Sequence, residues 1–400
     1  MRFPRGCGHN IYMQPATTAD DGLYWLALRM TPGLGTRKAG QLLEVFRSPQ
    51  AIFRASKSEL QAAGLAASVA QSLASGCAFD DAAEQQTLAG KAGAVLIPLT
   101  DARYPPALRD IFDPPPLLFA RGRVELLATL MIGVVGTRRP TAYGTVVATK
   151  LSADLAAAGM TIASGMARGI DTAAHKGVLE VGGGTIAVFG CGIDQIYPAE
   201  NRKLAEQIAE AGLLVTEFPM GAPAYPQNFP IRNRIISGMS AGVLVVEGSQ
   251  YSGSAITAKL AAEQNREVFA APGNITSKMS WGPNLLIKQG AKLVQEWNDV
   301  VVELKADDRR RLVDQCRNRL NLKDENSEET NAGDSASVLG SVAHAVLRLL
   351  RTDVPMGLDN LIESLEEVSS SEAIAALFEL ELGGLVRQLP GKSFIRVWLD

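Results

Sequence analysis

Small, hydroxyl and arginine side chains gather in this sequence directly after short apolar runs. One such group comprises Gly136, Thr137, Arg138 and Arg139, and another comprises Ser252, Gly253, Ser254 and Thr257. Backbone N–H groups, hydroxyls and guanidinium groups at the start of a helix are the partners that an anionic oxygen requires. Arg138 and Arg139 taken alone could be ordinary surface residues. Because the same arrangement occurs more than once, we favour an anion-binding site.

A third group lies in the segment SGMARGIDTAAHKG and comprises Ser164, Gly165, Arg168, Gly169 and His175. Asp171 in the same segment either faces a ligand or caps its own helix by accepting from the N–H groups of the first turn. His175 is equally ambiguous. It has no carboxylate or thiol at ligand spacing, so we expect neither a metal nor any other cofactor here.

A fourth group places an aromatic ring beside cationic side chains after a proline-rich loop. It comprises Phe229, Arg232, Asn233 and Arg234. A ring next to two arginines can stack a base and hold its phosphate, which is the combination that binds single-stranded nucleic acids. In the alternative interpretation, Phe229 belongs to the core and the arginines are solvated.

The elements that carry these groups are predicted to form a doubly wound α/β domain. Apolar runs alternate with helical segments between residues 131 and 294, namely MIGVVG, TIASG, GTIAVFG, GLLVTE, AGVLVVEG and REVFAAPG. Continuous Val, Ile and Leu runs between amphipathic helices indicate a mostly parallel sheet covered on both faces, as in a Rossmann-like fold. Ligands of such sheets bind at the carboxyl ends of the strands, close to where the four groups fall.

The remaining sequence predicts further domains on both sides of this sheet. We expect a disordered tail at 1–20, a helical domain at 21–80, the extended Rossmann-like domain at 81–298, a charged linker at 299–337 whose first half could be helical, and a winged helix at 338–400. The prolines of residues 104–122 predict an extended connector along the surface of the central domain, because proline disfavours helix.

Composition excludes several classes of protein. A net charge of -3 argues against a protein coated in basic residues, so a nucleic-acid site must be a local patch. Cys7, Cys77, Cys191 and Cys316 are widely spaced, which indicates neither a disulfide framework nor a zinc site. No apolar stretch reaches the length of a membrane span, and we expect a cytoplasmic protein without a membrane partner.

Six segments together resemble the DNA-processing protein A family, also called DprA or Smf. They cover about residues 105–294 and are VVGTRRPTAYG, SGMARGIDTAAHKG, TIAVFGCGIDQIYPAENRKL, FPIRNRIISGMSAGVLVVE, SGSAITAKLAAEQNREVFAAPG and GPNLLIKQGA. The resemblance implies an extended Rossmann-like domain that binds single-stranded DNA, protects it in natural transformation and loads RecA recombinase onto it. By the same resemblance, Arg138, Arg168 and the RNR segment correspond to the family's basic DNA pocket.

The resemblance also implies a homodimer, a helical SAM-like domain before the sheet and a winged helix after it. We expect the dimer to form where the run VFAAPG provides an apolar edge to the sheet. The hairpin PGLG at residues 32–35 resembles a helix-hairpin-helix with Arg37 and Lys38 nearby, and it could either contact a DNA phosphate or dock on a neighbour.

The winged helix departs from a DNA-reading one in its charge. Its expected recognition segment carries Glu372, Glu379 and Glu381 and no basic residue, whereas Arg387, Lys392 and Arg396 lie only in the wing. A DNA-reading helix needs donors against phosphates, so we expect this domain to bind protein instead.

An alternative of a different class is a nucleotide-processing enzyme similar to the LOG-type phosphoribohydrolases. Their general acid/base position is empty here, because the nearest acid after the loop SGSAIT is Glu263, late in its helix. Gly190 and Gly192 do not complete a dinucleotide fingerprint. With no catalytic set in the sequence, we expect a binding protein and not an enzyme.

Overall fold

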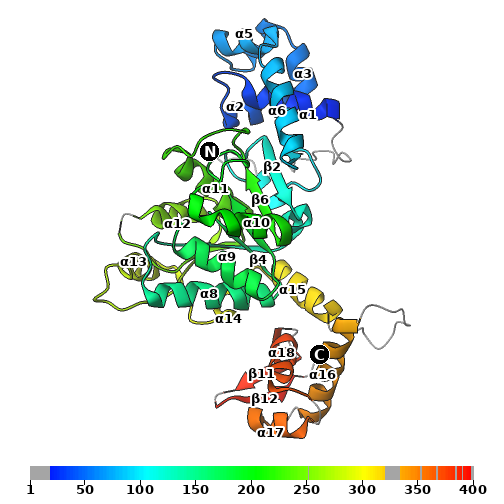
Figure 1. Ribbon diagram of the computed structural model, residues 1–400, viewed down its shortest axis with the longest axis vertical. Coiled ribbons are helices and arrows are strands. Elements are labelled where there is room, and N and C mark those ends of the chain that lie inside the picture. The colour runs from blue at the N-terminus through cyan, green and yellow to red at the C-terminus, as the bar shows by residue number, and fades with distance from the viewer. Residues whose placement is uncertain are drawn as a thin grey trace, which may run out of the picture. The chain divides into compact units, whose positions relative to one another are not determined.

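The computed structural model describes residues 19–250, 252–319, 334–351, 354–365, 368–382, 385–389 and 391–397. They divide into two compact units, one containing residues up to 299 except 157–160, and the other containing 157–160 and residues from 300 onward. Figure 1 labels the elements of both. Most of the predicted tail, residues 1–18, lies outside the described residues, and the first helix begins at Ala19.

The first unit begins with the predicted helical module. Its helices are α1 (Ala19–Met30), α2 (Thr36–Phe46), α3 (Pro49–Arg54), α4 (Lys57–Ala62), α5 (Ala67–Ser75) and α6 (Phe79–Lys91). Local sequence sets their starts: Ser48 caps α3 ahead of a proline, and Ser56 and Glu59 form a capping box on α4. Fully buried leucines such as Leu26, Leu42 and Leu60 make up its core.

The predicted mostly parallel sheet is present and has nine strands. They are β1 (Val95–Pro98), β2 (Leu117–Gly122), β3 (Met131–Val135), β4 (Thr161–Ser164), β5 (Thr185–Val188), β6 (Leu213–Thr216), β7 (Gly242–Val245), β8 (Glu267–Ala270) and β9 (Lys292–Leu293). Their order is β1-β2-β6-β5-β4-β3-β7-β8-β9. Strands β1 and β2 are antiparallel to their neighbours, and all other pairs are parallel.

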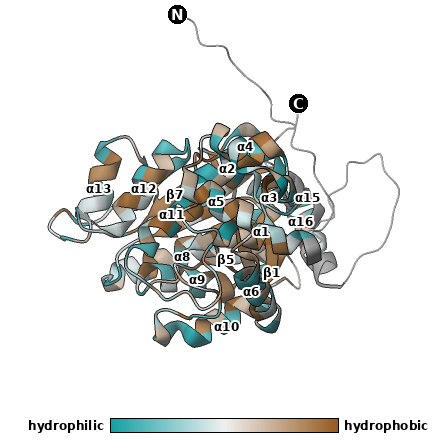
Figure 2. Ribbon diagram, turned by 90° about the horizontal axis from the view of Figure 1, so that it is seen from above, coloured by the Kyte–Doolittle hydropathy of each residue, from teal (hydrophilic) through white to brown (hydrophobic). Residues whose placement is uncertain are grey.

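The central strands β3 to β7 are buried along their whole length, which explains their continuous apolar sequences. The helices between the strands are α8 (Ala142–Ala157), α9 (Ile170–Glu180), α10 (Arg202–Ala211), α11 (Asn228–Met239), α12 (Gly253–Glu263) and α13 (Trp281–Lys288). Figure 2 colours β7 largely as hydrophobic, in agreement with its buried position. From β3 the chain winds one way through β4, β5 and β6, and β7 to β9 lie on the other side. The switch point of the sheet therefore lies between β3 and β7.

The proline-rich connector is not the extended surface path that its sequence predicts. Residues 106–109 form the short helix α7 (Pro106–Arg109), because proline is tolerated in a first helical turn. The following strand β2 is buried from Leu117 to Ala120 and pairs with β1 and β6. Tyr104 is fully buried and donates to the carbonyl of Pro115 at 2.9 Å. The connector is therefore part of the sheet.

The run VFAAPG is not an edge of the sheet either. It contains β8, which is covered by β9, so the two edge strands are β1 and β9. Short connecting helices complete the first unit: the 3₁₀ turns η1 (Val124–Ala128) and η2 (Ala199–Asn201), and α14 (Asn298–Val301), which spans the boundary to the second unit.

The second unit contains the predicted winged helix. Its elements are α15 (Ala306–Arg319), α16 (Asp334–Leu349), β10 (Met356–Gly357), α17 (Leu358–Ser364), α18 (Ser370–Leu382), β11 (Val386–Leu389) and β12 (Ser393–Arg396). The three strands form an antiparallel sheet in the order β10-β12-β11. Helix α15 occupies the first half of the predicted linker, and residues 320–333 lie outside the described residues.

Candidate functional site

A cavity of about 420 Å³ opens at the switch point between β3 and β7. Its walls come from the loop after β3, the loop before α9, the start of α11 and the start of α12. Ten of the predicted residues line it, namely Gly136, Thr137, Arg138, Phe229, Arg232, Asn233, Ser252, Gly253, Ser254 and Thr257. Asp171 and Tyr197 also line the cavity.

The loop after β3 is held tightly against the sheet. Gly136 has no room for a side chain, because a Cβ there would lie 2.5 Å from Cγ1 of Ile170. The N–H of Thr137 donates to the carbonyl of Glu247 at 2.7 Å. Arg138 is exposed and lines the cavity, whereas the equally exposed Arg139 does not.

Two aromatic rings form one wall. Phe229 is half-buried, and the guanidinium carbon of Arg138 lies 5.2 Å from the centroid of its ring. The ring of Tyr197 packs against that of Phe229 with 5.4 Å between the two centroids. Tyr197 is 43% exposed. It was not predicted from the sequence, although its position as an aromatic residue in the loop after β5 could have indicated it. The cation and the two rings together offer a surface on which a flat group can stack.

The N-terminus of α12 lines the same cavity. Ser252 caps the helix by accepting from the N–H of Ala255, and its Oγ lies 2.7 Å from Oγ of Ser254. Thr257 donates to the carbonyl of Gly253 at 3.2 Å. Ser252, Gly253 and Ser254 place the positive N-terminus of the helix at the cavity wall, where an anion is favoured.

The floor of the cavity holds a buried arginine. Arg232 is 3% exposed, and one of its Nη atoms donates to the carbonyl of Val188. Burial lowers the pKa of Arg232 to about 10, although Asp171 nearby opposes this shift. Among the described residues, Nε of Arg232 is one of few buried side-chain nitrogens without a hydrogen-bond partner. The floor thus offers an unused donor on a cation.

Asp171 does not cap its helix in the way that the simpler interpretation predicts. Its Oδ2 accepts from the N–H groups of Gly165 at 3.1 Å and Ala167 at 3.3 Å, both in the loop before α9. Burial raises the pKa of Asp171 to about 6, although Arg232 and the two N–H groups favour the ionised form. Asp171 therefore braces the loop from inside the cavity.

Other predicted residues lie outside the cavity. Ser164 is fully buried and donates to the carbonyl of Val134 at 2.7 Å, so it belongs to the sheet. His175 is fully buried, its Nδ1 lies 2.7 Å from Oγ1 of Thr185, and burial lowers its pKa to about 3. Arg168 is exposed and pairs with Glu200 at 2.7 Å, and Gly169 starts α9 with φ +79°.

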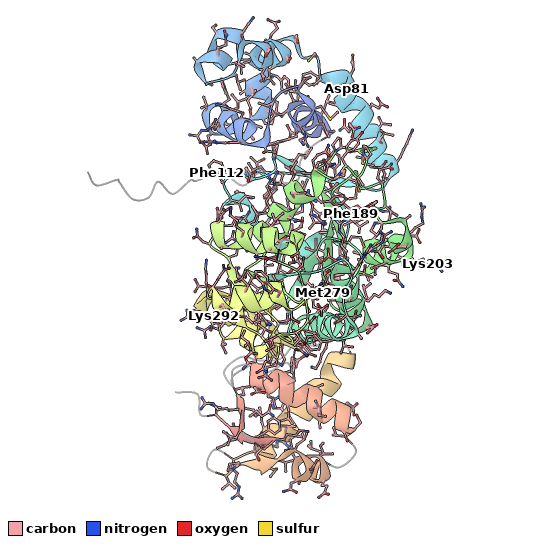
Figure 3. All side chains as sticks on the ribbon, turned by 90° about the vertical axis from the view of Figure 1, so that its left-hand side faces the viewer. Asp81, Phe112, Phe189, Lys203, Met279 and Lys292 are labelled. Carbon is pink, nitrogen blue, oxygen red and sulfur yellow. The ribbon has the colours of Figure 1, made fainter. Side chains whose placement is uncertain are left out.

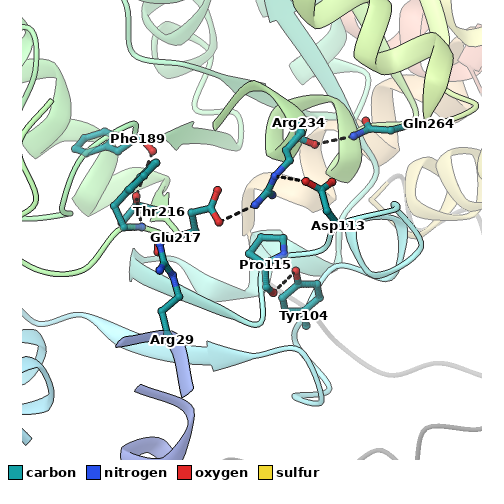
Figure 4. Close-up of polar contacts among 10 residues, drawn as sticks. Arg29, Tyr104, Asp113, Pro115, Phe189, Thr216, Glu217, Arg234 and Gln264 are labelled. Atoms are coloured by element: carbon teal, nitrogen blue, oxygen red, sulfur yellow. Dashed lines mark hydrogen bonds and ion pairs between the residues drawn. The ribbon is translucent and has the colours of Figure 1, made fainter. Parts of the chain in front are cut away.

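Arg234 lies on the other side of α11 from Arg232. Figure 4 shows its guanidinium between two carboxylates, Glu217 at 2.7 Å and Asp113 at 3.1 Å. Residues two apart on a helix point in different directions, so the two arginines of the RNR segment cannot face one ligand together. Arg234 instead lines a second cavity of about 350 Å³ with Leu34 and Gly35 of the helical module.

The predicted hairpin of the helical module adopts its expected turn. Gly33 has φ +76° and the N–H of Leu34 donates to the carbonyl of Thr31. The hairpin lies against the central domain: the carbonyl of Glu217 accepts from Arg29, and Arg37 covers the ring of Phe112 at 4.5 Å. Phe112 is nonetheless 75% exposed, and Figure 3 labels it at the surface. These contacts favour the docking alternative for the hairpin.

In the winged helix, Glu372 and Glu381 of α18 accept hydrogen bonds from neighbouring residues. Glu372 accepts from the N–H and hydroxyl of Ser369 ahead of the helix, and Glu381 accepts from the N–H of Gln388 in β11. Across the described residues, no group of three or more His, Cys, Asp or Glu side chains could hold a metal ion. In the same ranges, no helix combines the length and the apolarity that crossing a bilayer requires.

The fold is that of a Rossmann-like protein with a helical module before the sheet and a winged helix after it. Residues 95–305 match the model of the family described as DNA recombination-mediator protein A, and residues 330–392 match that of the DprA winged helix domain. The chain belongs to the DNA recombination-mediator protein A family.

Named relatives agree with this assignment. The chain is 46% identical to "DNA processing protein DprA" of Bacillus subtilis over 209 residues, 52% of this chain and 70% of that protein. It is 40% identical to "Protein Smf" of Escherichia coli over 310 residues, 76% of this chain and 77% of that protein. The crystal structure of DprA from Streptococcus pneumoniae is similar, with a TM-score of 0.63 at 33% identity, covering 72% of this chain and 99% of that one.

Proposed function

We propose that this protein binds single-stranded DNA in the cavity between β3 and β7. The observation that carries the proposal is the cluster of Arg138, Phe229 and Tyr197, which lines the same cavity as the N-terminus of α12. A base can lie on the aromatic wall while its phosphate is held by Arg138 and the helix N–H groups. Only an unpaired base offers its face in this way, so the cavity favours single strands over duplex.

The wider role is also proposed. In this proposal the protein acts in the cytoplasm as a homodimer, protects incoming DNA in natural transformation and loads RecA recombinase onto it, while the winged helix binds a protein partner. The support is the family's description as a recombination mediator and the DNA-processing names of its relatives. Sedimentation of the full chain tests the dimer, and RecA filament formation on single strands with and without the protein tests the loading.

The proposed role is binding and not catalysis. The alternative, a phosphoribohydrolase, requires a general acid/base beside the phosphate cradle. The acid after that cradle, Glu263, lies in the last turn of α12, is exposed and pairs with Lys259 at 3.7 Å. A nucleotide-hydrolysis assay with the purified protein distinguishes the two classes.

The main experiment measures the affinity for a labelled oligothymidylate by fluorescence anisotropy across salt concentrations. We expect Phe229→Ala to weaken binding by about 5- to 150-fold, the equivalent of ~1–3 kcal/mol for a lost stacked base. Arg138→Ala is expected to weaken binding and to reduce the salt slope by roughly 0.7 for one lost phosphate contact.

Arg139→Ala is the matched control, because Arg139 is an adjacent exposed arginine that does not line the cavity. Its salt slope should stay close to that of the wild type. If folded Phe229→Ala and Arg138→Ala proteins bind as the wild type does, the strand does not occupy this cavity.

A further inference from the structure

A carboxylate and a guanidinium meet beneath the cavity, at Gly165. Asp171 of α9 accepts from the N–H of Gly165, and the guanidinium of Arg232 from α11 covers the same glycine so closely that a Cβ there would collide with it. Both side chains line the cavity and are less than 10% exposed. The cavity floor therefore holds a buried negative charge next to Arg232, whose Nε has no partner and can add a contact to a phosphate held by Arg138.

Few charged side chains lie close to this pair. Arg232 and Arg138 are the charged side chains that act on Asp171. His175 and Cys191, which lie close to Arg232, stay neutral near pH 7, because burial moves their pKa values to about 3 and about 11. Strands β3, β4 and β5, which pack on α9, carry no charged residue, and the charged side chains of α10 are exposed. Protonation of Asp171 thus sets the net charge of the floor.

A phosphate in the cavity and the Asp171 carboxylate compete for one partner. Arg232 is fixed by its bond to Val188 and by the packing on Gly165, so it cannot turn away from either anion. Two negative charges around one buried guanidinium repel each other, because the local dielectric is low. The repulsion disappears when the carboxylate takes a proton from solvent, because the neutral form carries no charge. The neutral carboxyl group still accepts from the loop N–H groups, so the loop stays in place.

We propose that strand binding in this cavity is coupled to proton uptake by Asp171, so that Asp171 makes DNA affinity dependent on pH; this rests on the proposed function. The free protein is suited to such coupling, because burial already raises the pKa of Asp171 to about 6. A bound phosphate raises that pKa further, and affinity must then increase as pH falls from 8 toward 6. Each pKa unit that binding adds corresponds to about a tenfold difference between the high-pH and low-pH affinities.

The first test measures oligothymidylate affinity by anisotropy from pH 5.5 to 8.0 at constant ionic strength. We expect the wild type to bind more tightly at low pH, and Asp171→Asn to show a flatter profile with an affinity at pH 8 at least equal to that of the wild type. Asp194→Asn is the matched control. Like Asp171, Asp194 accepts from a loop N–H group, that of Gly221, but it is exposed and does not line the cavity. It should keep the wild-type profile.

The second test counts protons directly, beginning with the wild type. Calorimetric titration of the wild type with the same oligonucleotide, in two buffers of different ionisation enthalpy at pH 7, counts the protons taken up on binding. Uptake in the wild type that is reduced in Asp171→Asn supports the coupling. Zero uptake in a wild type that binds the strand, or the full uptake and pH profile in folded Asp171→Asn, overturns it. A wild type that binds no strand at any pH contradicts the proposed function instead.

Discussion

Replacing Arg234 by alanine should destabilise the folded protein without lowering its affinity for single-stranded DNA. Arg234 is 6% exposed and bridges Glu217 and Asp113, and it lines the second cavity and not the first. Although it belongs to the same RNR segment as Arg232, its side chain has no access to a strand bound at Phe229. The loss of this side chain should therefore lower the unfolding free energy and leave the affinity for DNA unchanged.

The size of the effect follows from what the substitution leaves behind. Glu217 is 1% exposed, and its pKa is raised by burial even with Arg234 and Arg29 nearby. Removing one partner of a buried ion pair costs ~3–5 kcal/mol, because the other charge stays buried without compensation. With an m-value of ~3 kcal/mol per molar, a loss of ~3 kcal/mol lowers the urea midpoint by roughly 1 M.

The assay combines urea unfolding with anisotropy under conditions where the variant is folded. We expect a lower midpoint and an unchanged affinity for Arg234→Ala. The exposed control Arg139→Ala should change the unfolding free energy by no more than ~0.5 kcal/mol. Pairing Glu217→Met with Arg234→Met should recover most of the stability, since apolar residues can replace a buried pair. An Arg234→Ala protein of normal stability that binds DNA poorly would refute this reasoning.

Three further outcomes are expected. Gly165→Ala should cost ~1–3 kcal/mol through overpacking and weaken strand binding, because the new Cβ must displace Arg232; equal urea midpoints and affinities would contradict this. Between about pH 4 and 6 the folded state binds the Asp171 proton that the unfolded chain, with a pKa of 3.8, releases. Unfolding free energy should therefore fall as pH rises, by up to ~3 kcal/mol, and denaturation of Asp171→Asn should lack this slope. Deleting residues 338–400, which hold five basic and nine acidic residues, should leave DNA affinity unchanged in a gel shift, and a marked loss would show a DNA role for the winged helix.

The sequence predicted the central strands well because their burial on both faces leaves uninterrupted apolar runs. It failed at residues 104–122, where rules for proline describe the local chain and could not show that the four apolar residues of Leu117 to Ala120 pair inside the sheet. Strand ends and glycines pointed to loops that line the cavity. The direction of each side chain was not predictable, since Arg232 and Arg234 differ only in the face of α11 that they occupy.

Contacts separated residues that the sequence treats alike. Ser164 and His175 lie in the same motif as Asp171, which lines the cavity, yet both bond to residues of the sheet and lie outside that cavity. Their hydroxyl and imidazole chemistry suited a ligand equally well. Only the three-dimensional path of the loop before α9 decides which members of the motif face the cavity.

The two ends of the nine-stranded sheet restrict how copies of the chain can assemble. β9 offers only two residues for pairing, Lys292 and Leu293, and β1 is four residues long and ends at Pro98, which has no N–H to donate. Short strands with a lysine or a proline at the margin resist edge-to-edge addition of another chain. A homodimer through this domain therefore has to be built by side-chain packing between helices or loops, and the same feature protects the protein from fibril-like polymerisation when its concentration rises.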